Sequence, residues 1–397
     1  MVVLVVIVLV RDGRQEVAPA PPVETPRASP AEAARALAAF VEAVQQRDAP
    51  AMERLAPSEL PAARELLSGI AANARSLDLT AVSARYVDQV DTVSSDGSWT
   101  GVAELTWQLR GFDDEPARSD VAVLFAPDSE GLGIAGFEAF AEEGGRLPLW
   151  LRGRLSVARA DDVLVMADGP ANVAEAATDR AVRGIDVVRR ALPDWSSPVV
   201  VEIPDSARSL DETLGAEPGT YAGIAAVTAP AGRASDVDGP VHVFVNPDVS
   251  DGLRRMGAQV VMSHELVHVA TDAVRRPVEP WLLEGFADYV ALRGTRLPDR
   301  VTLGRAIEAA RRDGVPEALP TAADFDPRAR NLQARYEEAW LACRIIAERV
   351  GERALIEVYG AATRRDDLER ALNGAGFGLG DLTATWRDEL RVRVRRQ

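Results

Sequence analysis

The segment that decides the fold covers residues 260–290 and reads VVMSHELVHVATDAVRRPVEPWLLEGFADYV. It contains His264 and His268, two of the three histidines in the chain. Four residues apart on a helix, the two imidazoles share one face, and Glu265 follows the first of them. This H-E-x-x-H pattern can bring both imidazoles to one metal ion, with a carboxylate beside the bound water. Beyond His268, Glu284 can complete a three-ligand site with one open position.

These residue types are suited to hydrolysis at a metal ion. Zinc is held by nitrogen and carboxylate ligands in a tetrahedron, and catalysis requires that one position remain for water. Glu265 lies beyond ligand reach, so it can take the proton of that water, whose pKa the metal lowers to about 7. Asp288 lies one turn after Glu284, where it can hold the distal N–H of His264. We therefore expect a Zn2+ cofactor with His264, His268 and Glu284 as its ligands.

Outward from this segment, strands precede the motif and helices follow it. Upstream, four alternating or wholly apolar stretches predict strands, at residues 155–168, 198–203, 221–229 and 240–247. A helix is predicted at about 171–192, and downstream a long one at about 328–350, on which Cys343 is expected as a buried structural thiol. Residues 150–397 therefore predict one domain, in which a small mixed sheet is followed by a helical subdomain.

A separate α+β domain is predicted at residues 31–142. Ser29, Pro30 and Glu32 match an N-cap, a first-turn proline and a capping-box acid, so a helix should start there. A second helix is predicted at about 60–75. Four alternating segments then predict an antiparallel meander, at residues 77–90, 98–110, 118–127 and 131–140.

Helices packed on such a curved meander resemble the nuclear-transport-factor-like cone fold, an accessory or binding module in many proteins. Tyr86, Trp99 and Trp107 lie on the predicted strands and could line a pocket, but half-buried sheet positions are the expectation. Two adjacent glycines, at positions 144 and 145, and Pro148 break the periodicity in residues 142–154. The domain boundary is therefore predicted there. A tether at residues 1–30 and the cone-like domain at residues 31–142 precede it.

The metal motif carries a resemblance to a known family. His264 and His268, with Glu284 in WLLEGFADY, resemble the gluzincin metallopeptidases, the group that contains thermolysin and the aminopeptidase N family. The closest likeness is to their peptidase MA-like bacterial branch. It covers roughly residues 155–397, through the order of sheet and helices and the segment YEEAWLACRIIAERVGERALIEVY. The resemblance implies a zincin-type fold and zinc-dependent hydrolysis of peptide bonds.

The resemblance also has consequences for individual residues. It implies that Tyr336, at the start of the long helix, points at the metal and stabilises the oxyanion; a partly buried helix tyrosine is the alternative. No Gly-x-Met-Glu-Asn segment is present, so exopeptidase activity is not implied. Substrate would pair with an edge strand, which is either 221–229 or 241–247. His242 is expected to alternate outward on its strand rather than to bind metal.

Composition limits the partners and the location. The chain has 397 residues, a net charge of −16 and no lysine, which argues against nucleic acid as a partner. The aliphatic run at residues 2–10 is shorter than the roughly twenty residues that span a bilayer, and a Pro/Ala-rich tether follows it. We expect the remnant of a signal anchor, with a buried strand as the alternative. An extracytoplasmic protein, membrane-anchored or secreted, is the resulting prediction.

Three functions follow from these features. The first is a zinc-dependent endopeptidase that acts on a peptide or protein substrate, with Glu265 as general base. The second is a zinc-binding scaffold without proteolytic activity, whose N-terminal module binds a partner. The third is a structural protein that binds no metal, which requires the ligand pattern to be coincidental. The intact Glu265 favours the first.

Overall fold

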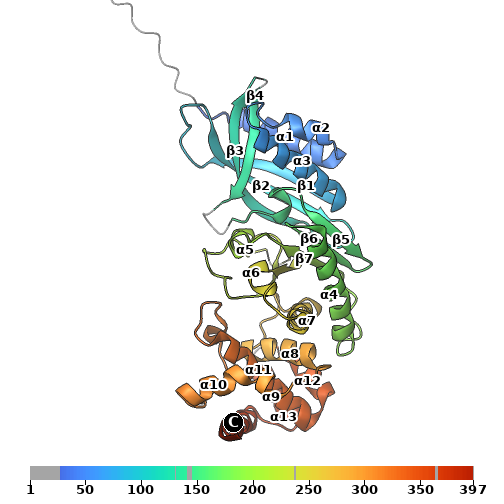
Figure 1. Cartoon of the computed structure of the whole chain (residues 1–397), viewed down its shortest axis with the longest axis vertical. Helices are drawn as coiled ribbons and strands as arrows, with labels where there is room; N and C mark the ends of the chain where they lie inside the picture. The colour runs from blue at the N-terminus through green and yellow to red at the C-terminus, as the bar shows by residue number, and fades with distance from the viewer. Residues whose placement is uncertain (1–26, 130, 141–144, 237, 363–364, 397) are drawn as a thin grey trace, which may run out of the picture.

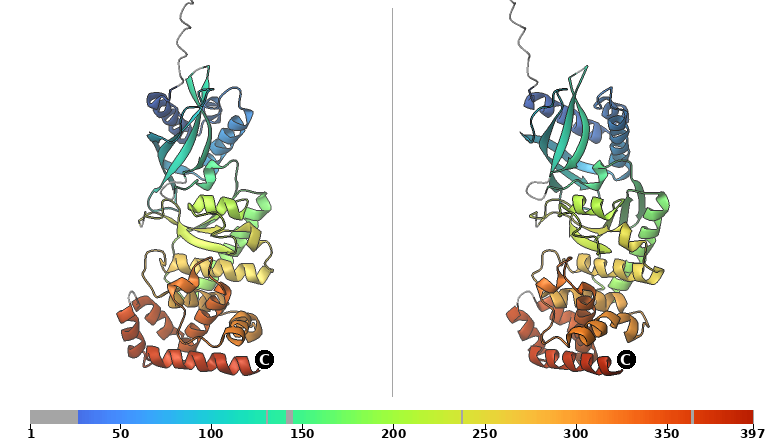
Figure 2. Two further views of the ribbon diagram at one scale, coloured as in Figure 1. Left: turned by 90° about the vertical axis from the view of Figure 1, so that its left-hand side faces the viewer. Right: turned by 60° about the vertical axis from the view of Figure 1, so that its left-hand side comes forward.

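The computed structural model describes residues 27–129, 131–140, 145–236, 238–362 and 365–396. Along the long axis of the molecule, an antiparallel sheet, a mixed sheet and a helical region follow one another (Figures 1 and 2). The predicted α+β fold class is confirmed. The aliphatic run at residues 2–10 lies outside the described residues. Among the helices that are described, none has the length and apolar character needed to cross a membrane.

The first sheet is an antiparallel meander with helices against one side. Its strands pair in the order β1-β2-β3-β4 and have the bounds Leu79–Gln89, Trp99–Leu109, Ala117–Asp128 and Gly131–Ala139. Three helices precede it: α1 (Pro30–Gln46), α2 (Ala49–Arg54) and α3 (Pro61–Ser76). Ser29 is the N-cap of α1 and Pro30 its first residue, but the Ser29 side chain makes no capping hydrogen bond, so the predicted capping box is not formed.

The aromatic residues of this sheet belong to its core. Trp99 and Trp107 are 5% and 3% exposed, deeper than the half-buried positions predicted for them. Tyr86 is partly buried and packs edge-on against Trp99, with 5.9 Å between the ring centroids. The sheet therefore uses these rings for packing, in agreement with their strand periodicity.

The segment after the meander inserts into this same core. A short 3-10 helix, η2 (Leu149–Leu151), carries Trp150, which is 2% exposed and packs against Phe40 of α1 and Trp107 of β2. The amide nitrogen of buried Asn73 donates to the carbonyl of Trp150 at 2.9 Å. The residues predicted to separate two domains thus join them. The domain bounds themselves remain a prediction.

The second sheet is mixed and has five strands in the order β5-β6-β7-β9-β8. The bounds are Ser156–Ala160, Val163–Ala167, Val199–Ile203, Val241–Val245 and Ala226–Pro230 in that order. β6, β7 and β9 are parallel neighbours, while β5 and β8 pair antiparallel at the two edges. The long helix α4 (Ala171–Arg189) makes the crossover between β6 and β7, as a parallel pair requires.

Both faces of this sheet are covered, which explains why its central strands are mostly apolar. Val163 and Val165 of β6 pack with the helices, whereas Leu164 and Met166 pack with the core of the first sheet. Such two-sided burial is expected for parallel strands. The first sheet, with its helices, therefore acts as the cover for one face of the second.

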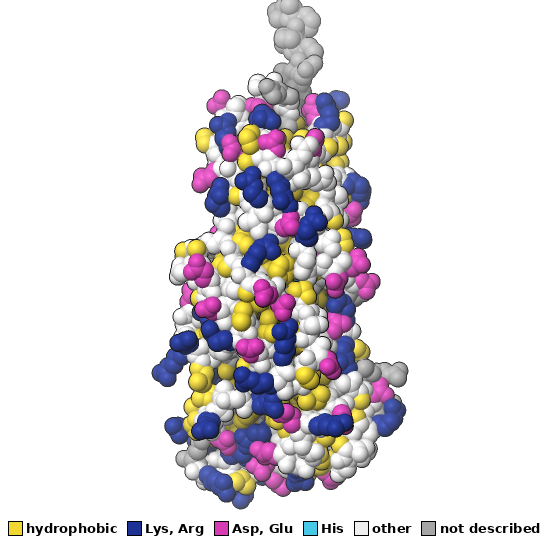
Figure 3. All heavy atoms as spheres, turned by 90° about the vertical axis from the view of Figure 1, so that its right-hand side faces the viewer, with side chains coloured by type: hydrophobic (Ala, Val, Ile, Leu, Met, Phe, Trp, Pro, Cys, Tyr) yellow, Lys and Arg dark blue, Asp and Glu magenta, His cyan; other side chains and the backbone are white. Residues whose placement is uncertain are grey.

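The helical region carries the motif and closes the other face. The helix α7 (Arg255–Ala270) packs on α4, where Gly184 permits the contact: a Cβ there would lie 2.6 Å from Leu266. The further helices are α5 (Ala207–Leu214), α6 (Pro247–Ser250), α8 (Pro280–Leu292), α9 (Asp299–Thr302), α10 (Gly304–Asp313), α11 (Leu332–Val350), α12 (Glu352–Ala361), α13 (Arg365–Gly374) and α14 (Leu379–Arg396). On the face drawn in Figure 3, arginine and acidic side chains are interspersed.

Candidate metal centre

The helices α7 and α8 bring the predicted ligands together. His264 and His268 lie one turn apart on α7, and Glu284 lies in the first half of α8, which begins at Pro280. Proline suits the first turn of a helix because its missing N–H has no partner to lose there. The two imidazole side chains are 11% and 9% exposed and the Glu284 side chain 16% exposed. The group is thus mostly buried but open to a small ligand.

The three ligand atoms converge on one point. The Nε2 atoms of His264 and His268 are 3.0 Å apart, and Oε2 of Glu284 lies 3.1 Å and 3.4 Å from them. Ligands at about 2.05 Å from a tetrahedral zinc ion lie about 3.3 Å from one another. The observed separations are close to that value. His264, His268 and Glu284 can therefore hold one metal ion.

Asp288 orients one of the imidazoles. Its Oδ1 lies 2.8 Å from Nδ1 of His264, so Nδ1–H can donate to the carboxylate and Nε2 keeps its lone pair toward the group. Burial by itself lowers the pKa of His264, but Asp288 and Glu284, with Glu265, outweigh it and raise the pKa well above 6.5. The carboxylates around His264 thus favour a positive charge at the ligand group. A metal cation can supply this charge, as a proton does.

Glu265 has a partner that the sequence analysis missed. Its side chain is buried beside His264, and its Oε2 accepts a hydrogen bond of 2.7 Å from the hydroxyl of Thr228. Thr228 lies in the middle of β8, the edge strand of the second sheet. Of the two candidates for the edge strand, β8 is therefore the one beside the motif, and β9 lies inside the sheet. The order of the strands, which the sequence leaves open, was the missing information.

Tyr336, which the resemblance implies should point at the metal, has its ring beside that of His264. It is the fifth residue of α11, its ring is partly buried, and its centroid is 6.0 Å from that of His264 in an edge-on arrangement. Phe325 also packs edge-on against the ring of Tyr336, with 5.4 Å between the centroids. Burial first, and then Glu284 and Glu265, raise the pKa of Tyr336 far above its usual value. The hydroxyl therefore stays protonated and can donate a hydrogen bond.

Gly285 explains how α11 comes so close to the ligands. A Cβ at this position would lie 2.3 Å from the carbonyl oxygen of Ala339 and 2.9 Å from the sulfur of Cys343. Only a residue without a side chain allows α8 and α11 to pack at this distance. Cys343 is completely buried, as predicted, and burial raises the pKa of its thiol well above the usual value.

His242 differs from its prediction. It lies on β9 and outside the metal group, but it does not point outward: it is 1% exposed. Its Nδ1 is 2.7 Å from Glu202 and its Nε2 is 2.9 Å from Asp113, which belongs to the turn between β2 and β3. The alternation rule fails here because the first sheet covers this face of β9.

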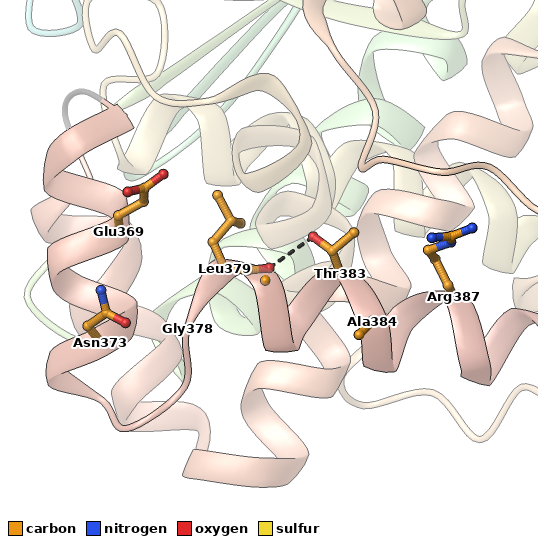
Figure 4. A pocket seen from close by; sticks show the side chains of 8 residues that line it. Glu369, Asn373, Gly378, Leu379, Thr383, Ala384 and Arg387 are labelled. Atoms are coloured by element: carbon orange, nitrogen blue, oxygen red, sulfur yellow. Dashed lines mark hydrogen bonds between the residues drawn. The ribbon is translucent and has the colours of Figure 1, made fainter.

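A cavity of about 630 Å³ lies elsewhere, between α13 and α14. Figure 4 shows Glu369 and Asn373 on one of these helices and Thr383 and Arg387 on the other. None of the residues that line it belongs to the metal group. The cavity is therefore a separate surface feature.

Comparisons with protein-family models and with curated proteins find no match to this chain.

Proposed function

We propose that the protein is a zinc-dependent peptidase of the gluzincin type that cleaves within peptide chains. The single observation that carries the proposal is the convergence of His264 Nε2, His268 Nε2 and Glu284 Oε2 within 3.0–3.4 Å, with Glu265 next to the first of them. Two imidazoles and one carboxylate form a donor set that suits zinc and leaves a position open. The resemblance of the motif to gluzincins supports the same choice.

Each residue would contribute a distinct task. When bound, zinc supplies Lewis acidity and lowers the pKa of water to about 7. The carboxylate of Glu265 would take the proton from the attacking water and later transfer it to the leaving amine. Thr228 would hold that carboxylate through its 2.7 Å hydrogen bond. The hydroxyl of Tyr336 would donate to the negative charge that develops on the scissile carbonyl oxygen.

The edge strand beside the motif would bind the substrate backbone. In the antiparallel ladder with β9, the N–H of Asn246 donates to Ala225 and the N–H of Ala231 donates to Pro240. Paired and unpaired residues alternate along such a ladder, so Ala226 and Thr228 direct their backbone groups away from β9. These groups would pair with an extended peptide, as exposed strand edges do in peptide recognition. The expected substrates are therefore unfolded or extended segments.

Metal analysis and a cleavage assay test the proposal together. The purified wild type is expected to hold about one zinc per chain, and His264→Ala is expected to lose it and to recover none on reconstitution. The wild type should cleave members of an unstructured peptide library. The matched control is Glu279→Gln, a carboxylate at the start of α8 that lies outside the metal group. A wild type that takes up no metal would contradict the proposal.

A further inference from the structure

The hairpin formed by β8 and β9 is attached to the N-terminal domain by a salt-bridge cluster. The guanidinium of Arg233, in the loop between these strands, lies 3.2 Å from Glu104 of β2 and also pairs with Asp120 of β3. The side chains of this cluster are only about one-third exposed or less, so water screens them incompletely. The backbone N–H of Arg233 also donates to the carbonyl of Arg118 at 2.7 Å.

The adjacent residue shows how closely the two parts approach. A Cβ at Gly232 would lie 2.5 Å from the carbonyl oxygen and 2.6 Å from the nitrogen of Arg118. Only a glycine permits this backbone contact. The loop of the hairpin therefore packs closely against the start of β3, and its ion pairs are part of this interface.

Arg146 fixes the end of the edge strand itself. Its guanidinium donates to the carbonyl of Pro230, the last residue of β8, and its own backbone bonds with Ser119 of β3. Arg146 is 4% exposed, so this contact is almost completely removed from water. Together with the His242–Asp113 contact on β9, it attaches both strands of the hairpin to the first sheet.

The segment that follows the first sheet packs into the interior of the N-terminal domain. Trp150 lies between α1 and β2, in contact with Phe40 and Trp107, and the side chain of Asn73 bonds with the backbone of Trp150 and Leu155. Part of the space between the helices and the sheet is thus occupied by the segment that leads to the second sheet.

We propose that the N-terminal domain positions the edge strand β8 for substrate binding, with Arg233 as a positioning residue. The inference rests on the proposed peptidase function, because β8 flanks the metal group through the contact of Thr228 with Glu265. The zinc ligands come from α7 and α8, which Arg233 does not contact. Loosening the hairpin should therefore weaken binding of the peptide backbone and leave metal binding intact.

The test compares Arg233→Ala with the matched control Arg85→Ala in the full-length, zinc-loaded protein. Arg85 pairs with the other oxygen of Glu104, at 3.3 Å, and does not touch the hairpin. In Arg233→Ala we expect amide hydrogen exchange in residues 226–231 to be about fivefold faster, and KM for a cleaved peptide to rise about fivefold. The value of kcat and the zinc content should stay at wild-type levels.

A double variant on the other side of the interface, Glu104→Gln with Asp120→Asn, should reproduce these changes. Combining the double variant with Arg233→Ala should change the exchange rates and KM no further, since the three residues form one cluster. Wild-type exchange rates and KM in Arg233→Ala, or equal effects in Arg85→Ala, would overturn the inference. A wild type without peptidase activity would contradict the proposed function instead, because hydrogen exchange still reports whether the domain holds β8.

Discussion

Raising the pH should lower the free energy of unfolding of the protein, because one buried histidine, His242, binds its proton more tightly in the folded chain than in the unfolded chain. It lies between Glu202, at 2.7 Å, and Asp113, at 2.9 Å, with both of its ring nitrogens in contact with carboxylates. Burial by itself lowers the pKa of His242, but the two carboxylates outweigh it and raise the pKa from 6.5 to about 9. The positive charge of Arg146 also interacts with Glu202.

The direction of the effect follows from the two pKa values. Below pH 6.5 the histidine is protonated in both the folded and the unfolded chain, and its ion pairs contribute their full stability. Between that pH and about 9, the unfolded chain loses the proton while the folded chain retains it. At about 1.4 kcal/mol per pH unit, the free energy of unfolding should fall by about 3 kcal/mol over this range.

Urea denaturation at a series of pH values measures this loss, with Asp113→Asn as the comparison. The variant lacks one of the two carboxylates, so the pKa of His242 should be lower in it than in the wild type. Its free energy of unfolding should therefore fall less between pH 6.5 and 9. Because the chain has three histidines, NMR can follow the His242 ring directly. A His242 pKa below 6.5, or the same pH dependence in wild type and Asp113→Asn, would refute the reasoning.

Three further predictions concern the metal centre and its supports. Gly285→Ala should lower the free energy of unfolding by about 1–3 kcal/mol, since the new Cβ meets the backbone of Ala339; unchanged urea midpoints would contradict this. Tyr336→Phe should keep its zinc but reduce kcat about a hundredfold, and a wild-type kcat would exclude its hydroxyl from catalysis. Asp288→Asn should weaken zinc affinity by about tenfold or more in a chelator competition, whereas equal affinity would show that its contact with His264 is dispensable.

The sequence predicted those parts of the centre that depend on helical spacing. His264, His268 and Glu265 follow from the i, i+4 geometry of one helix, and Glu284 and Asp288 from the same spacing on the next. The structure places the side chains of this set, apart from Glu265, within hydrogen-bond distance of His264 or one another. Local periodicity was sufficient to place each pair on one face of its helix, whereas the contacts of Glu284 and Asp288 with His264 join α7 and α8.

The missed features depend on tertiary arrangement. Thr228 reaches Glu265 only because β8 is at the edge of the sheet, and strand order is not encoded in alternation. His242 was predicted to point outward because its strand alternates, but the N-terminal domain covers that face. Likewise, the insertion of Trp150 into the preceding core is not indicated by the glycines and proline before it. In each case a distant segment determines the environment.

The most direct test of the proposed mechanism is the peptide-cleavage rate of Glu265→Gln, measured with its zinc content. This variant keeps the size of the side chain and the hydrogen bond from Thr228, and it removes only the capacity to take a proton. We predict about one zinc per chain, as in the wild type, and a cleavage rate lower by about 10²–10⁴-fold. Zinc-loaded Glu265→Gln that cleaves peptides at the wild-type rate would contradict the assignment of Glu265 as the general base.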